Sequence, residues 1–397
     1  MAWTCRTILA IAAVGAIVAA DAAPAAGNHY TVAYRFKGGA DGQGPVGGLI
    51  DVGGVLYGTT FGGAAYGDGS VFSLDPNSGA EKIVYAFGAY QGDGQYPAGA
   101  LLEVDGAVFG TTSTGGHANS GTVFSLDLTT GAETVVHSFA GGSDGAGPLG
   151  NLISIDGMLY GTTQAGGSTT NCGAGCGTVF SLNPTTGVNT VVYDFKGGND
   201  GANPQASLLE VGGKLYGTTK YGGAGYGVVF SLDPKTGREK IEYSFAGGGD
   251  GAYPLGSLIK GGAALYGTTN EGGSHSSGAV FSFTPKSGAE QVLYSFQNGQ
   301  NDGAYPTGSL ILVNGLLYGT ASGGGVGQCY FSCGEVFSVD PGASGEQIEH
   351  FFQGGRDGGK PAADLVNVVG RLYGTTSQGG DSTNCNTGCG AVFAFKP

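Results

Sequence analysis

A unit of about fifty residues is repeated seven times along this chain, and the repeat restricts the fold more than any other feature of the sequence. Each unit contains D-G-x-x-P, an apolar run, L-Y-G-T-T, a double glycine, V-F-S-L-D-P and a closing run of the type Y-x-F. The aspartate–proline pairs are Asp41/Pro45, Asp93/Pro97, Asp144/Pro148, Asp200/Pro204, Asp250/Pro254, Asp302/Pro306 and Asp357/Pro361. A period of this length with short strand-like runs is typical of β-sheets repeated around an axis.

The second unit reads as four antiparallel strands. Its alternating and β-branched runs predict strands over 100–104, 107–112, 122–126 and 133–139. Asp105-Gly106 is a two-residue hairpin turn of the type in which glycine supplies a positive φ. Four such strands make one propeller blade, and no run has a sustained helical period.

The order of the strands predicts that the ring is closed. The repeats begin with a fourth-type strand at 30–36 and end with a third-type strand at 391–395, which gives seven sets of four strands. We therefore expect an all-β, seven-bladed β-propeller of four-stranded antiparallel blades, with the N-terminal strand joining the C-terminal blade in a single domain over 30–397. An open solenoid is the alternative, but it would need atypical capping repeats, which neither end has.

The first 25 residues predict a cleaved signal peptide. One arginine precedes a short apolar stretch, and small residues form A-x-A sites near residue 25. The alternative is an uncleaved anchor, for which the stretch is short. We expect a secreted or periplasmic monomer with no membrane span in the mature chain.

The charge of the chain argues against nucleic acid as a partner. The formal net charge is −14, and the 16 lysines and arginines are spread along the chain without a basic stripe. Neutral or cationic ligands suit such a surface better.

Connectivity predicts which face carries the site. Because strands alternate in direction, the D-G-x-x-P linkers and the glycine-rich loops between second and third strands emerge on one face. The opposite face receives only tight turns. The longer and more variable loops therefore gather on one face of the ring.

Six cysteines form three C-x-x-x-C pairs in the second loops of blades three, six and seven. They are Cys172/Cys176, Cys329/Cys333 and Cys385/Cys389. The number of cysteines is even, and each has a partner nearby in the sequence. In an exported chain these two features favour three small disulfides. A zinc site made of four thiolates from blades six and seven is the alternative.

The repeated aspartates have two interpretations. A ring of carboxylates could bind cations, or each aspartate could accept backbone N–H bonds within its own turn. We favour the structural role, because a residue repeated in every blade occupies seven equivalent places, whereas a ligand site breaks the symmetry.

Residues that depart from the repeat on the variable face are the better site candidates. Tyrosine rings can stack on sugars, and paired ionisable groups can act as acid and base. The ligand-binding candidates are Tyr66, His117, Lys220, Tyr221, Tyr226, Glu271 and His275. If the protein is an enzyme, the catalytic candidates are Glu271, His275, Asp68, Asp381 and Tyr221. We predict no metal site and no cofactor, since neither H-E-x-x-H nor a phosphate-binding loop occurs.

The motifs L-Y-G-T-T-x-x-G-G and G-T-V-F-S-L-D-P-x-T-G resemble the GloVer tandem repeat of bacterial choice-of-anchor proteins. The resemblance covers 30–397, although the sixth unit has Thr320-Ala321 where the others have Thr-Thr. It implies a secreted or surface-displayed repeat protein and carries no common activity. The layout is also similar to kelch propellers, without their tryptophan.

Two functions remain open from the sequence. The first is a non-enzymatic propeller that binds extracellular glycan through tyrosines on the variable face. The second is a polysaccharide lyase or glycoside hydrolase that acts on the same face, for which a hydrolase would need two convergent carboxylates.

Overall fold

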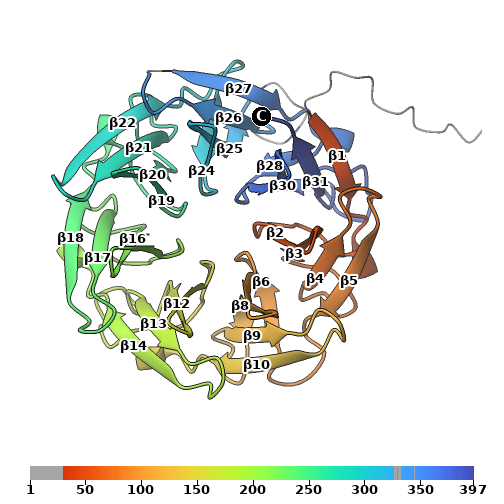
Figure 1. Ribbon diagram of the computed structural model, residues 1–397, viewed down its shortest axis with the longest axis horizontal. Helices are drawn as coiled ribbons and strands as arrows, with labels where there is room; N and C mark the ends of the chain where they lie inside the picture. The colour runs from red at the N-terminus through yellow and green to blue at the C-terminus, as the bar shows by residue number, and fades with distance from the viewer. Residues whose placement is uncertain (1–29, 326–328, 330–331, 344) are drawn as a thin grey trace, which may run out of the picture.

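The computed structural model describes residues 30–397 except 326–328, 330–331 and 344. These residues form a closed ring of seven antiparallel sheets around a central axis (Figure 1). The predicted seven-bladed β-propeller is confirmed, and helix in the described residues is limited to short 3-10 turns. Within the described ranges, no helix has the length and apolar character that crossing a membrane requires. The predicted signal peptide at 1–25 lies outside the described residues.

The strands of the first four blades follow the repeat in order. Blade 1 holds β2 (Ile50–Val52), β3 (Val55–Thr60), β4 (Ser70–Leu74) and β5 (Glu81–Ala86). Blade 2 holds β6 (Gly94–Pro97), β7 (Leu102–Val104), β8 (Ala107–Gly115), β9 (Thr122–Leu126) and β10 (Glu133–Ser138). Blade 3 holds β11 (Ile153–Ile155), β12 (Met158–Thr163), β13 (Thr178–Leu182) and β14 (Asn189–Asp194). Blade 4 holds β15 (Leu209–Val211), β16 (Lys214–Thr219), β17 (Val228–Leu232) and β18 (Glu239–Ser244).

The last three blades include the closing strand. Blade 5 holds β19 (Ile259–Gly261), β20 (Ala264–Thr269), β21 (Ala279–Thr284) and β22 (Ala289–Ser295). Blade 6 holds β23 (Gly303–Pro306), β24 (Ile311–Val313), β25 (Leu316–Gly324), β26 (Glu335–Val339) and β27 (Glu346–Phe351). Blade 7 holds β28 (Gly359–Pro361), β29 (Val366–Val368), β30 (Arg371–Gln378), β31 (Ala391–Phe395) and β1 (Tyr30–Arg35). The 3-10 turns are η1 (Gly39–Asp41), η2 (Gly142–Asp144), η3 (Gly198–Asp200), η4 (Gly248–Asp250) and η5 (Gly355–Asp357).

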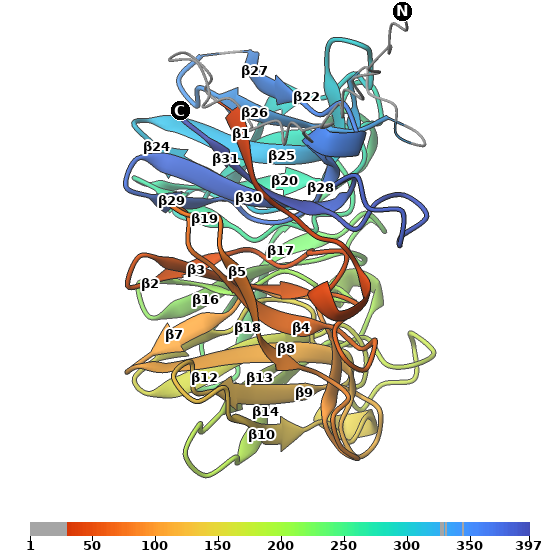
Figure 2. The same ribbon diagram turned by 90° about the vertical axis from the view of Figure 1, so that its right-hand side faces the viewer.

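The N-terminal strand closes the ring as predicted. β1 pairs antiparallel with β31, and the register runs from Tyr30 opposite Phe395 to Arg35 opposite Ala391. Figure 2 shows β1 lying along β31 at the C-terminal end of the chain. The pairing supplies blade 7 with its outer strand and leaves neither terminal strand with an orphan edge.

Three short strands exceed the predicted four per blade. In blades 2, 6 and 7, part of the linker pairs with an extended second strand, as β6 with β8, β23 with β25 and β28 with β30. In blades 2 and 6 the linker is one residue longer than in the others, which changes its path. The four-stranded core of each blade is unaffected.

Phenylalanines join the blades to one another. The phenylalanine of each third strand is fully buried, and the glycine of L-Y-G lies over its ring. A Cβ atom at Gly58 would lie 2.7 Å from Cζ of Phe72, so no larger residue fits there. The phenylalanine after each fourth strand packs edge-on against the third-strand phenylalanine of the next blade, with centroids 5.0–5.2 Å apart. Such aromatic pairs add about 0.5–1.5 kcal/mol beyond their burial, and here they close around the whole ring.

Linkers and second loops meet on one face, as the connectivity predicted. Backbone bridges join Ala202 to Tyr221 and Ala252 to Glu271, so each linker lies beside the second loop of its own blade. Figure 2 places the β2 and β24 hairpins at the opposite edge of the ring. We call the face with the linkers the loop face.

Candidate functional site

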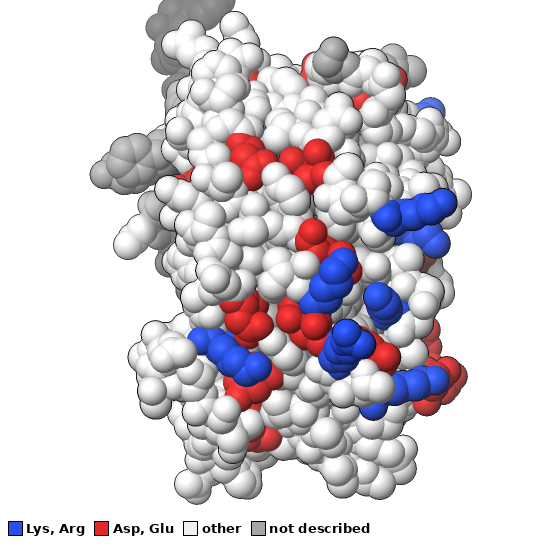
Figure 3. Space-filling view, turned by 90° about the vertical axis from the view of Figure 1, so that its left-hand side faces the viewer, with Lys and Arg blue, Asp and Glu red and all other residues white. Residues whose placement is uncertain are grey.

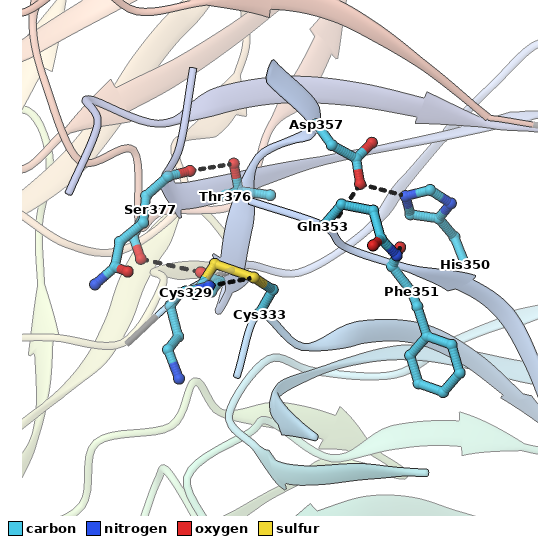
Figure 4. The surroundings of a disulfide bond; sticks show 10 residues. Cys329, Cys333, His350, Phe351, Gln353, Asp357, Thr376 and Ser377 are labelled. Atoms are coloured by element: carbon cyan, nitrogen blue, oxygen red, sulfur yellow. Dashed lines mark hydrogen bonds and ion pairs between the residues drawn. A yellow bond between two sulfur atoms is a disulfide. The ribbon is translucent and has the colours of Figure 1, made fainter. Parts of the chain in front are cut away.

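The repeated linker aspartates hold their own turns. Asp200 accepts the amide of Lys196 (2.7 Å) and the hydroxyl of Tyr193 (2.5 Å). Figure 4 shows the equivalent arrangement at Asp357, which accepts the Gln353 amide (2.8 Å) and faces Nε2 of His350 (3.1 Å). These contacts agree with the structural interpretation of the D-G-x-x-P aspartates.

The glycine after each aspartate is required by its neighbours. A Cβ atom at Gly251 would lie 2.6 Å from Oγ1 of Thr269, the second threonine of L-Y-G-T-T. Gly251 also has a positive φ of 98°. Gly94 in blade 2 has an ordinary φ, so there the close approach of Thr112 and Thr122 alone requires glycine. D-G and G-T-T are therefore two sides of one contact in every blade except blade 6, where Gly303 faces Glu335 and Ala321.

The six cysteines form the three predicted disulfides. Bonds join Cys172 to Cys176, Cys329 to Cys333 and Cys385 to Cys389, so the zinc alternative is wrong. Figure 4 shows the Cys329–Cys333 bond in its loop.

Each disulfide covers a glycine of the following linker. A Cβ atom at Gly197 would lie 2.9 Å from Sγ of Cys172, and one at Gly354 would lie 3.0 Å from Sγ of Cys329. At the seam between blades 4 and 5, Tyr226 takes this place and lies against Gly247, whereas His117 packs on Gly92 of the linker of its own blade. Tyr226 and His117 thus have a packing role that sequence reasoning did not assign.

The structure brings four residues together between blades 4 and 5. The Tyr221 and Tyr253 rings have centroids 5.6 Å apart, and Tyr226 lies 6.0 Å from Tyr253. Lys220 places its Nζ 5.3 Å from the centroid of Tyr221, a cation–π contact. Tyr221 and Tyr226 remain 43% and 38% exposed. We call these four residues the aromatic cluster.

A cavity of about 360 Å³ lies beside this cluster, between blades 3 and 4. Tyr221 forms part of its wall, the Cys172–Cys176 disulfide another part, and Asn203 contributes a polar edge. Glycines of the second loop and linker supply most of the remaining lining. Its volume lies within the ~300–1,000 Å³ that ligand pockets usually have. We call it the Tyr221 cavity.

Tyr66 and Asp68 lie in blade 1, away from the aromatic cluster. Tyr66 is 57% exposed. The carboxylate of Asp68 accepts a hydrogen bond from Nε2 of Gln95 (2.8 Å), and Phe61 stacks on Tyr96 nearby at 5.1 Å. This is a second exposed aromatic group on the loop face, between blades 1 and 2.

The remaining catalytic candidates are dispersed. Asp381 of blade 7 pairs with Arg356 at 2.8 Å, and His275 of blade 5 contacts Oγ of Ser274 at 3.0 Å. Glu271 is exposed on the second loop of blade 5. Over the described residues, no hydrogen bond or ion pair joins the side chain of Glu271 to that of any other catalytic candidate.

Four glutamates with raised pKa values lie in the seams between blades. Burial, with the charge of Asp200 second, raises the pKa of Glu239 to about 7, and Tyr193 lies between these two carboxyls. Burial raises the pKa values of Glu81, Glu133 and Glu290 to about 7 in the same way. Perturbed pKa values often mark active sites. These recur at equivalent positions, so we assign them to the architecture.

The outer wall around β18 and β22 carries charges of both signs. Figure 3 shows the side of the ring around β18 and β22, where lysine and arginine side chains lie beside carboxylates.

Sequence reasoning missed the residues that line the central channel. The second residue before each three-residue inner strand faces the axis, and its identity varies from blade to blade: Gly48, Ala100, Asn151, Ser207, Ser257, Ser309 and Asp364. The amide of Ser207 donates to Oγ of Ser257 and that of Ser257 to Oγ of Ser309, both at 2.9 Å. The channel encloses about 230 Å³. The sequence did contain a signal for these residues: this position varies from unit to unit, whereas the residues on either side of it are nearly constant.

Comparison with known proteins gives a family and a fold. The sequence profile of the Gloeobacter/Verrucomicrobia repeat matches residues 13–175 and 156–333. No curated protein matches the sequence.

Several solved propellers are similar in structure. An oligogalacturonate lyase in complex with manganese has a TM-score of 0.52 and 13% identity, with 92% of this chain and 89% of that chain covered. An extracellular domain assigned to a one-component system of B. thetaiotaomicron has a TM-score of 0.57 and 8% identity, covering 91% of this chain but 40% of that one. At these identities the likeness concerns the fold alone.

Proposed function

This chain belongs to the Gloeobacter/Verrucomicrobia repeat family, and from that premise and the exposed aromatic cluster we propose that it is an exported propeller that binds neutral extracellular glycan. The predicted signal at 1–25 and three disulfides support export to the periplasm or the medium. The proposal takes the protein to act as a monomer.

The observation that carries the proposal is the position of Tyr221. The side chain is 43% exposed and forms part of the wall of the Tyr221 cavity. The Nζ atom of Lys220 lies over the ring, 5.3 Å from its centroid. An exposed ring with a hydroxyl offers an apolar face for the C–H surface of a sugar, and Asn203 can bind hydroxyl groups nearby. The disulfide and the surrounding backbone contacts fix the opposite wall, so little ordering is needed on binding.

Affinity gels over common bacterial and plant polysaccharides test this proposal. We expect the wild-type protein to be retarded by at least one neutral polysaccharide, and Tyr221→Ala to migrate freely in the same gel. Tyr66→Ala is the matched variant, because it removes a more exposed tyrosine at a different seam. Its retardation should equal that of the wild type.

Two results would remove the proposal. Free migration of the wild-type protein in every gel would exclude glycan binding, and retardation of Tyr221→Ala equal to wild type would exclude this site. Thermal melts of both variants check that the ring is intact.

Polysaccharide cleavage is the second function, and the dispersed catalytic candidates give it less support. A hydrolase needs carboxyl groups about 5–9.5 Å apart, and Glu271, Asp68 and Asp381 belong to three different blades. Incubating the retained polysaccharide with the protein and measuring new reducing or unsaturated ends distinguishes cleavage from binding.

A further inference from the structure

Blade 6 departs from the repeat inside the blade. In the six other blades a threonine ends G-T-T, as Thr112 does, and lies opposite a small or uncharged residue such as Thr122. In blade 6, Ala321 takes the threonine position and Glu335 lies opposite. The smaller alanine leaves room for the longer glutamate, so the two departures belong together.

Glu335 is fully buried without a hydrogen-bond partner. Its exposed fraction is 0%, and neither carboxylate oxygen has a partner among the described residues. The carboxylate points at Gly303, where a Cβ atom would overlap Oε1, so the glycine of D-G keeps the space open. The Gly303 amide lies nearby without reaching hydrogen-bonding geometry.

Two further carboxylates converge on Glu335. Asp302 of the linker is 6% exposed, and Glu346 begins β27. One ligand oxygen from each of the three lies within 4.8 Å of the others. Oδ1 of Asp302 and Oε1 of Glu346 also lack hydrogen-bond partners among the described residues.

Blade 2 shows what the same place looks like without the third carboxylate. There Asp93 accepts the Tyr85 hydroxyl at 2.9 Å, and Glu133 accepts the hydroxyl of Tyr90 at 2.9 Å. The equally long linker of blade 6 has Gly299 where blade 2 has Tyr90. Blade 6 therefore has no counterpart of the Tyr90 hydroxyl: Tyr294 lies beside both Asp302 and Glu346, as Tyr85 does beside Asp93 and Glu133, and Glu335 is added.

Two buried carboxylates and one half-buried carboxylate, so close together, need a counter-charge or protons. Leaving ionised carboxylates unpaired in the interior costs several kcal/mol each. We propose that Asp302, Glu335 and Glu346 bind one divalent cation of the Ca²⁺ type. All donors are oxygens, the class that hard cations take, and neither histidine nor cysteine is among them.

The spacing of the oxygens suits such an ion. Ca²⁺ binds oxygens at about 2.3–2.6 Å, so ligands on opposite sides of one ion are about 4.6–5.2 Å apart. The three oxygens lie within 4.8 Å of one another, so no pair of them is too far apart to bind the same ion. The ion would join the blade 6 linker to the third and fourth strands, in place of the hydrogen bonds that the other blades use.

Protons are the competing occupants. Without a cation, burial raises the pKa values of both Glu335 and Glu346, and the charge of Asp302 adds to the first as the charge of Glu335 adds to the second. A cation must displace these protons, so binding should strengthen as the pH rises.

Calorimetric titration of the chelator-treated full protein with CaCl₂ tests the proposal, in a buffer at about pH 8, where proton competition is weakened. We expect one Ca²⁺ per chain and a melting temperature that rises with Ca²⁺ concentration. MnCl₂ and MgCl₂ titrations establish which divalent ion binds best.

The double variant Ala321→Thr/Glu335→Thr restores the threonine pair of blade 2 and should fold. It should bind Ca²⁺ at least tenfold more weakly and lose the thermal shift. Glu133→Gln changes the equivalent fourth-strand glutamate of blade 2 and should bind as the wild type does.

No stoichiometric binding of any of the three ions to the wild-type protein would overturn the proposal and assign the cluster to shared protons. Wild-type affinity in the double variant would overturn it as well, because the ion would then lie elsewhere. Neither result bears on glycan retention.

Discussion

Asn151 and Asp364 join two non-adjacent blades across the central channel. Nδ2 of Asn151 donates a hydrogen bond to Oδ2 of Asp364 over 3.1 Å, although 213 residues separate them. Asn151 also accepts the Ala100 amide at 2.6 Å, and Asp364 accepts the Ser309 amide at 2.6 Å. These two residues thus tie blades 2, 3, 6 and 7 at the axis.

Replacing Asn151 with alanine should lower the free energy of unfolding by about 1–3 kcal/mol, because the Ala100 amide and the Asp364 carboxylate each lose a partner inside the channel. Denaturant unfolding measures the change. Asn367→Ala is the control, since that side chain accepts only the Gly370 amide in an exposed turn. The two variants having equal stability would contradict a role for the channel bridge.

Removing residues 1–37 should destabilise the ring far more than removing residues 1–29. The longer deletion takes away β1, its ladder to β31 and the fully buried Phe36, and loss of one buried phenylalanine alone costs about 3–5 kcal/mol. It also exposes β31 as an edge, so we expect aggregation in size-exclusion chromatography. Identical melting temperatures for the two deletions would contradict closure by β1.

The ring, its closure and the disulfides were predictable because they depend on residues repeated in phase. The pairing of Tyr30 with Phe395 followed from counting strands. The C-x-x-x-C spacing gave each cysteine one partner close to it in the sequence. Repetition also identified the linker aspartates as structural.

Contacts between single blades were not predictable in this way. Which residue faces the axis, as Asn151 does, depends on the radial orientation of a first strand that is only three residues long. Tyr226 and His117 broke the repeat and were assigned to a ligand, yet both also pack on linker glycines. Ala321 was recognised as a departure, but its partner Glu335 lies 14 residues further along the chain and became meaningful only in the folded blade.

Removing the first disulfide should have a modest effect on the whole ring and a larger one on its loop. Closing so short a loop removes little chain entropy, so Cys172→Ala/Cys176→Ala should cost about 2 kcal/mol or less. Because the sulfurs cover Gly197, amides of this loop and linker should exchange hydrogen faster, while those of blade 1 should not change. Hydrogen exchange followed by mass spectrometry measures both, and unchanged protection around Gly197 would contradict the covering role.

The seam carboxyls should make the propeller more stable in mild acid than in mild base. Burial raises the pKa values of Glu81, Glu133, Glu239 and Glu290 from 4.5 to about 7 in the folded chain. Between these two values the folded state binds more protons than the unfolded state, so stability falls as the pH rises through about 7. We expect a higher melting temperature at about pH 5 than at about pH 8, at constant ionic strength and with chelator present.

Glu239→Gln/Glu290→Gln mimics the protonated groups and should flatten this dependence, mainly by raising stability at the higher pH. Glu271→Gln, an exposed carboxyl on the loop face, should leave the profile unchanged. A melting temperature that rises from the lower to the higher pH in the wild-type protein would show that the seam carboxyls do not control its stability.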